Sequence, residues 1–209
     1  MAVRRGAGFI AALIVAGCAS AGLPSSGIAN GAVKEAYLPL SHWSLDFKAL
    51  STQHGSAFVI APHVAVTNAH NANLLPPDSI LAKSDFDLLF FRTEKLAPPS
   101  FAQPSLGEPV IAYGNGAAGE LRQAEGRVRA LGEYVAPLCP DCRAQQALVF
   151  DANAGVGFSG GPVVDSGTGA VLGIVFGYRD APDGRRMYAY DIGLVMDEMH
   201  RLLGPAAAR

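Results

Sequence analysis

The chain has 209 residues, of which 50% are hydrophobic and 16% are charged, and its formal net charge is −2. This composition indicates a folded globular protein, and the length allows one domain or two small β barrels that share an interface. The sequence has no block of like charge, so no nucleic-acid-binding surface is predicted.

The N-terminus has the pattern of an export signal. Arg4 and Arg5 precede an apolar stretch over residues 6–16 that is too short to span a bilayer. The stretch ends in the letters VAGC, which close at Cys18 and resemble the lipobox of bacterial lipoproteins. The resemblance implies removal of a signal peptide over residues 1–17, acylation of the cysteine, and attachment to a membrane of the bacterial cell envelope, on the periplasmic or outer-membrane side.

A second cleavage pattern leaves another destination open. Residues 19–21 read Ala-Ser-Ala, the form of an ordinary signal peptidase site, and cleavage there would give a secreted protein without a lipid. The small and polar residues over 18–33 predict a flexible tether between the anchor and the folded domain.

From residue 34 onward the sequence predicts an all-β chain. Short apolar and β-branched runs alternate with turns that contain Gly or Pro. The predicted strands cover residues 55–60, 64–67, 88–91, 109–113, 125–130, 147–150, 162–165, 170–176 and 188–191. Apolar residues at helical spacing predict a single helix near residues 193–204. Many short strands with one terminal helix indicate a β barrel or sandwich.

A serine in a glycine-rich turn is the strongest functional signal. Ser159 stands in Gly-Phe-Ser-Gly-Gly-Pro over residues 157–162. Small neighbours leave a hydroxyl uncovered and direct backbone N–H groups toward one point, as a serine nucleophile with an oxyanion hole requires. The alternative is an exposed serine at an ordinary hairpin corner.

A serine nucleophile needs a base, and the base needs an orienting carboxylate. His70 ends the run Val-Thr-Asn-Ala-His, where a buried strand stops and presents an imidazole. Asp87 opens the apolar run Asp-Leu-Leu-Phe-Phe, and a carboxylate there is costly to bury without a partner. Asp85 and Asp78 are nearby alternatives, and each of these side chains could also serve a structural or solvated position.

The order His, Asp, Ser with the segments TNAH, DLLFF and GFSGGP resembles the trypsin-like serine peptidases, most closely the bacterial HtrA-type protease domain without a PDZ domain. Residues 107–115, 126–131 and 167–177 resemble further segments of that family, and the likeness covers about residues 50–200. It implies a chymotrypsin-like fold of two antiparallel barrels, each of the six-stranded type.

The resemblance also implies domain boundaries. A peptidase domain is expected over residues 34–204, with an N-terminal barrel over about 34–100, a C-terminal barrel over about 107–192 and the terminal helix. Only 17 positions separate the histidine from the aspartate, so the N-terminal barrel is expected to be abbreviated.

The family's roles transfer to matching positions. Ser159 becomes the nucleophile, His70 the general base and then acid, and Asp87 the orienting carboxylate, while the N–H groups of Gly157 and Ser159 become the oxyanion hole. The resemblance implies a serine endopeptidase that acts on polypeptides through an acyl-enzyme. It implies no metal and no organic cofactor.

Six further positions are expected to contact substrate. Asn153 and Ala154 are expected near the base of the primary specificity pocket. The wall of the pocket and the edge that pairs with substrate are expected to contain Phe176, Gly177 and Tyr178. Phe158 precedes the nucleophile and is expected to narrow the cleft. The pocket base carries no acid, so a modest apolar side chain is expected before the cut rather than Arg or Lys.

Two cysteines remain, Cys139 and Cys142, in the spacing Cys-Pro-Asp-Cys. A local disulfide is predicted for an exported protein, with a reduced redox pair and a metal site as alternatives.

Two rival functions remain to be weighed. The pattern Gly157-x-Ser159-x-Gly161, followed by Asp191 and His200, fits an α/β-hydrolase elbow, but such an elbow must lead into a helix and here leads into a strand. The other rival is a catalytically inactive, trypsin-like lipoprotein that binds peptides or proteins.

Overall fold

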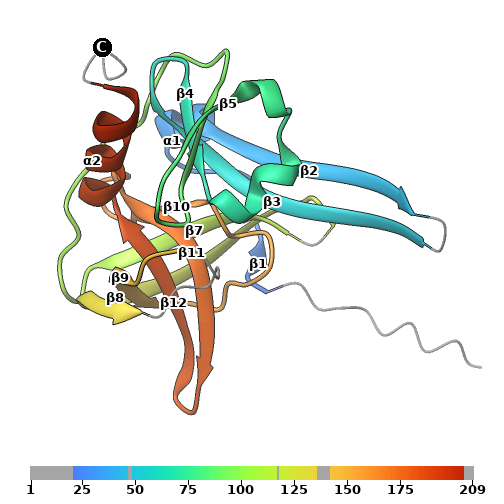
Figure 1. Cartoon of the computed structure of the whole chain (residues 1–209). Coiled ribbons are helices and arrows are strands. Elements are labelled where there is room, and N and C mark those ends of the chain that lie inside the picture. Colours follow the sequence, from blue (N-terminus) through green and yellow to red (C-terminus); the bar gives the residue numbers. More distant parts are fainter. Residues whose placement is uncertain (1–20, 47–48, 117, 136–141, 205–209) are drawn as a thin grey trace, which may run out of the picture.

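Two antiparallel sheets form the structure, one from residues 37–92 and the other from residues 109–191 with the short N-terminal strand β1 (Leu23–Pro24) added (Figure 1). The computed structural model describes residues 21–46, 49–116, 118–135 and 142–204. The sheets and one longer C-terminal helix confirm the predicted all-β, chymotrypsin-like double barrel.

The N-terminal sheet has the strand order β2-β3-β4-β6-β5. Its strands are β2 (Tyr37–Asp46), β3 (Ala49–Ala61), β4 (Val64–Thr67), β5 (Ile80–Lys83) and β6 (Leu89–Arg92). All four residues of β4 are buried because the strand is central and apolar. Two 3₁₀ helices, η1 (Ala69–Leu74) and η2 (Pro77–Ser79), join β4 to the short β5. This compact connection accounts for the short interval between His70 and Asp87.

The C-terminal sheet has the order β1-β8-β7-β10-β11-β12-β9, and β8 also pairs with β9. Six strands therefore close into a ring, to which the short β1 (Leu23–Pro24) is added. The ring contains β7 (Pro109–Asn115), β8 (Leu121–Val135), β9 (Gln145–Asp151), β10 (Pro162–Asp165), β11 (Val171–Ala181) and β12 (Gly184–Asp191). The far ends of β11 and β12 form a hairpin that projects from the barrel (Figure 1).

The prediction of a flexible tether over residues 18–33 is wrong for residues 21–33, the part that the structure describes. β1 pairs with β8, and Ile28 is buried. Helix α1 (Gly31–Ala36) begins at Asn30, whose side chain accepts the Val33 N–H at 3.1 Å. Asparagine is a favoured N-cap residue, so Asn30 is a helix-start signal within a segment whose small and polar composition predicted a tether.

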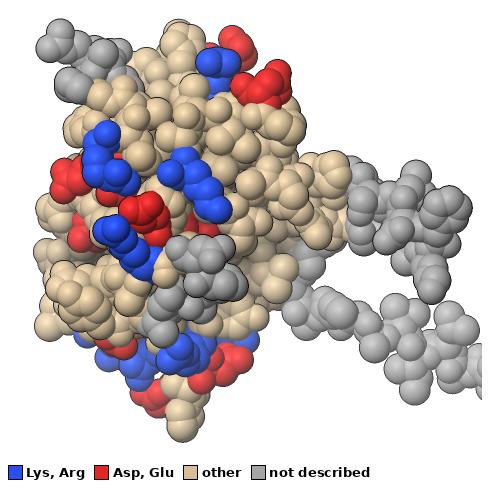
Figure 2. Space-filling view, viewed as in Figure 1, with Lys and Arg blue, Asp and Glu red and all other residues tan. Residues whose placement is uncertain are grey.

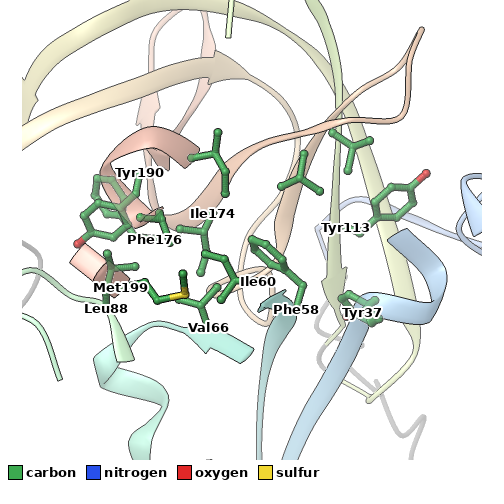
Figure 3. Close-up of a cluster of buried hydrophobic side chains, with 14 of the residues drawn as sticks. Tyr37, Phe58, Ile60, Val66, Leu88, Tyr113, Ile174, Phe176, Tyr190 and Met199 are labelled. Carbon is green, nitrogen blue, oxygen red and sulfur yellow. The ribbon is translucent and has the colours of Figure 1, made fainter. Parts of the chain in front are cut away.

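Helix α2 (Ile192–Leu203) is the last described element, and it packs across both sheets. The Asp191 side chain accepts the N–H groups of Gly193 and Leu194, which caps the helix. Figure 3 shows the buried cluster beneath it. This cluster unites side chains of the two sheets and the helix: Phe58, Ile60, Val66, Leu88, Ile174, Phe176, Tyr190 and Met199. Because it lies between the barrels, the cluster sets their relative position.

Glu198 is the buried charged residue of α2. Its carboxylate accepts hydrogen bonds from the Ser84 hydroxyl and, at 2.8–2.9 Å, from the Arg201 guanidinium. The Arg201 hydrogen bonds, set against partial burial, hold the pKa of Glu198 below its ordinary value of 4.5. The folded state therefore favours the charged carboxylate.

Replacing Glu198 with glutamine should lower the free energy of unfolding by about 1–2 kcal/mol at pH 7. The loss should be much smaller at pH 3, because the stabilisation exists above the ordinary carboxyl pKa and disappears as the pH falls through the lowered one. Urea unfolding at both pH values tests this, with the exposed Glu133→Gln as the control. Equal losses at both pH values would contradict it.

Charged side chains are mixed over the face shown in Figure 2, where most of the surface is uncharged. Arg186, for example, pairs with both Asp151 and Asp183. Within the described residues, no helix is both long and apolar enough to pass through a bilayer.

Candidate active site

The pairing of β4 with β6 brings His70 and Asp87 together. Thr67 pairs with Leu89, and the two strands are antiparallel. The histidine lies three residues after the end of β4 and the aspartate two residues before the start of β6. Both side chains therefore leave the sheet at the same edge, on either side of the connection through η1, η2 and β5.

The Asp87 carboxylate contacts both the backbone and the imidazole ring of His70. One oxygen lies 2.6 Å from Nδ1, and the other accepts the backbone N–H of the same histidine at 3.0 Å. The carboxylate side chain is 3% exposed and the imidazole 41%. A carboxylate only accepts hydrogen bonds here, so Nδ1 carries the proton and Nε2 is left as the basic nitrogen.

Two buried side chains fix the backbone of Asp87. The Tyr190 hydroxyl accepts its N–H at 2.9 Å, and the Asn68 amide donates to its carbonyl at 2.9 Å. Burial raises the pKa of Tyr190, which keeps the phenol neutral beside the carboxylate. The alternatives do not share this environment: Asp85 is exposed and pairs with Arg143 at 3.4 Å, and Asp78 lies in the exposed helix η2.

Ser159 lies in the loop between β9 and β10 and lines the same cleft as His70, with a volume of about 660 Å³. Its carbonyl accepts the Ser56 N–H at 2.9 Å and the Asn71 amide at 3.1 Å. Through the described ranges its hydroxyl has no hydrogen-bond partner. The backbone of the serine is thus tied to the N-terminal barrel while its hydroxyl stays available.

Gly157 shapes the backbone before the serine. Its φ is +88°, and a Cβ there would lie 1.6 Å from the Asn115 carbonyl oxygen, so only glycine fits. Its own carbonyl accepts the Asn115 N–H at 3.0 Å and the Ser56 hydroxyl at 2.9 Å. In the part of the chain described, the N–H groups of Gly157 and Ser159 donate to no protein acceptor. They are available for an anionic oxygen in the cleft.

The predicted substrate contacts divide into two groups. Phe176, Gly177 and Tyr178 line the cleft, together with residues 155–157. Asn153 is exposed and lines a different hollow on the C-terminal barrel, while Ala154 is buried in that barrel's core. The last two therefore do not face the cleft in this structure.

The prediction that Phe158 narrows the cleft is wrong. Its side chain is fully buried in the C-terminal barrel. Gly114 and Gly22 lie directly against the ring, where a Cβ would come within 2.4 Å and 2.9 Å of it. Because these two positions carry no side chain, the aromatic ring fits inside the barrel.

Three positioning residues were missed in the sequence: Ser56, Asn71 and Tyr190. The Ser56 hydroxyl also accepts the Asn115 N–H at 2.9 Å and lies 3.0 Å from the Tyr37 hydroxyl. Burial raises the pKa of Tyr37 to about 12. For Ser56, the available signal was a polar residue beside the apolar run of residues 57–60, because buried polar groups need partners. The partners themselves come from distant segments, which local patterns do not reveal.

The cysteine predictions lie partly outside the described residues. Cys18 and Cys139 belong to the ranges that the structure does not describe. The lipid anchor and the disulfide between Cys139 and Cys142 therefore stay predictions.

Comparison with known proteins places this geometry in context. Residues 71–174 match the trypsin-like peptidase domain, a range that begins directly after His70 and includes Asp87 and Ser159. No curated protein matches the sequence. Among solved structures, the active form of the Rv3671c protease from M. tuberculosis is similar, with a TM-score of 0.65, 23% identity and 82% of each chain covered.

Two further structures show the same architecture. The HtrA-type protease AlgW with a tripeptide has a TM-score of 0.65 and 17% identity, covering 84% of this chain and 64% of that one. The MamO protease domain from Magnetospirillum magneticum has a TM-score of 0.62 and 16% identity, covering 80% and 97%. The fold is thus the chymotrypsin-like double barrel, and residues 71–174 within it match a trypsin-like peptidase domain.

Proposed function

We propose that the protein is a serine endopeptidase in which Ser159, His70 and Asp87 act together. The observation that carries the proposal is the 2.6 Å contact between His70 Nδ1 and the buried Asp87 carboxylate, in the cleft that Ser159 also lines. A carboxylate that fixes the imidazole tautomer is what a histidine base requires.

The chemistry follows from these positions. Nε2 of His70 takes the Ser159 proton as the serine oxygen attacks a peptide carbonyl carbon. The negative charge on the carbonyl oxygen is stabilised by the N–H groups of Gly157 and Ser159, and the imidazolium by Asp87. The imidazolium then protonates the amine as the C–N bond breaks. His70 next takes a proton from water as the water oxygen attacks the acyl carbon, and it returns that proton to Ser159 Oγ as the bond from the acyl carbon to Oγ breaks.

The cleft supports extended peptides as substrates. Gly177 and Tyr178 lie on β11 at its rim, where a peptide could pair through its backbone. None of the described residues that line the cleft is Asp or Glu. We therefore propose an uncharged, apolar side chain before the scissile bond rather than Arg or Lys.

We also propose that the protein is exported and attached to a membrane of the bacterial cell envelope through acylated Cys18. The support is the basic, apolar and small-residue order of positions 4–18. Cleavage at residues 19–21 would give a secreted protein instead.

Labelling with a fluorophosphonate tests the proposed chemistry. Intact-mass analysis should show one adduct on the wild type, none on Ser159→Ala and much slower labelling of His70→Ala. Ser166→Ala, which changes an exposed serine in the turn after β10, should label like the wild type. A folded wild type without an adduct would contradict the proposal and favour the inactive, peptide-binding alternative.

A further inference from the structure

The first described residues lie against the wall of the cleft. A Cβ built on Gly155 would be 2.9 Å from the Ala21 side chain, and Gly155 itself lines the cleft. The Arg122 guanidinium donates to the carbonyls of Ala21 (2.8 Å) and Gly22. Ser25 donates its N–H to the Leu121 carbonyl at 3.0 Å. The N-terminal segment is therefore docked on the C-terminal barrel next to the cleft.

This docking limits how far the cleft can lie from the proposed anchor. Three residue steps connect Cys18 to Ala21, so covalent geometry allows a separation of at most about 11 Å. A lipid on the cysteine would therefore hold the adjoining cleft wall close to the bilayer surface. A flexible tether of the length expected from the sequence would have placed no such limit.

Exposed apolar side chains occur at the same place. Leu23 in β1 is 70% exposed, Val156 beside Gly155 is 69% exposed, and Tyr178 is 38% exposed. The Tyr178 ring reaches within 4.0 Å of the built Gly155 Cβ. These three residues, here called the apolar rim, account for three of the seven large hydrophobic residues that are exposed in the described chain.

Arg185 fixes the rim residue Tyr178. Its guanidinium lies 4.2 Å from the Tyr178 ring centroid and donates to the Ala154 carbonyl at 2.8 Å. Asp180 holds the same guanidinium through two hydrogen bonds of 2.7 and 3.2 Å. The position of the Tyr178 ring is thus fixed by a cation–π contact with a guanidinium that is itself held by hydrogen bonds.

We infer that the apolar rim rests on the lipid surface beside acylated Cys18, so that the cleft takes peptide segments that emerge next to the bilayer. The substrate class is then the juxtamembrane part of a membrane-attached polypeptide. An amphipathic ring such as tyrosine is suited to the interface, and burial of a second apolar element would strengthen a single lipid anchor. The inference rests on the proposed peptidase function and lipid anchor.

Lipid contact can be measured without enzyme activity. Full-length protein, extracted from bacterial membranes with its anchor, would be placed in phosphatidylethanolamine–phosphatidylglycerol vesicles that contain brominated lipid. Leu23→Trp should be quenched at least twofold more strongly than Leu106→Trp, whose site is equally exposed at 70% and lies before β7. Equal quenching, or a Cys18 that carries no lipid by intact mass, would overturn the inference.

Cleavage tests the substrate class separately. Peptides tethered to the vesicles would carry the same scissile sequence either about 3 or about 20 residues from the lipid. The wild type should cleave the short-tethered peptide about tenfold faster, and a 20-residue Gly/Ser insertion between Ser20 and Ala21 should remove that preference. Both proteins should cleave a soluble peptide equally. An unchanged preference after insertion would overturn the inference, whereas failure on the soluble peptide would count against the peptidase proposal.

Discussion

Replacing Asp87 with asparagine is expected to lower kcat for peptide hydrolysis about 10⁴-fold while the protein stays folded. The carboxylate now accepts from both the backbone N–H and Nδ1 of His70. An asparagine side chain has one acceptor and one donor group, so it cannot satisfy both. Its NH₂ group would favour the tautomer with the proton on Nε2, which cannot take the proton of Ser159.

The matched control is Asp85→Asn. Asp85 is two residues away, exposed and paired with Arg143 at the surface, so its replacement should leave kcat within about twofold. Steady-state kinetics and thermal melts of both variants would separate catalysis from folding. Comparable losses of kcat in the two variants would remove the assignment of the orienting carboxylate to Asp87.

The second large effect is expected for Gly157→Ala, which should lower kcat about 10²–10³-fold with a smaller change in KM. A Cβ at this position would lie 1.6 Å from the Asn115 carbonyl oxygen, and φ is +88°. The loop must move to accept the methyl group, and this movement would displace the N–H groups of residues 157 and 159 from the positions that the proposed oxyanion hole requires. The oxyanion forms only in the transition state, so kcat falls more than binding.

Gly107→Ala provides the control for backbone strain. Gly107 has a similar φ of +79°, but a Cβ there meets nothing within 4 Å. It should lose about 1 kcal/mol of stability through its left-handed conformation and keep its kcat. If Gly157→Ala retained wild-type kcat, or if Gly107→Ala lost it equally, the loop before Ser159 would have no part in stabilising the oxyanion.

Local patterns were sufficient for the elements that carry their own signal. Alternating apolar residues and Gly- or Pro-containing turns predicted most strands, and the segments around His70, Asp87 and Ser159 identified the candidate site residues without reference to the fold. Each of these signals lies within a few residues of chain, because turn geometry and strand burial act locally.

Contacts between distant segments decided the rest. The Thr67–Leu89 register, not the length of the intervening chain, brings the imidazole to its carboxylate. Phe158 turned inward because Gly22 and Gly114, far away in sequence, left room for its ring. The segment after residue 20 reads as a tether by composition, yet it docks because β8 and Arg122 supply hydrogen-bond partners. Composition reports what a segment can do alone, whereas packing depends on which surfaces the folded chain places beside it.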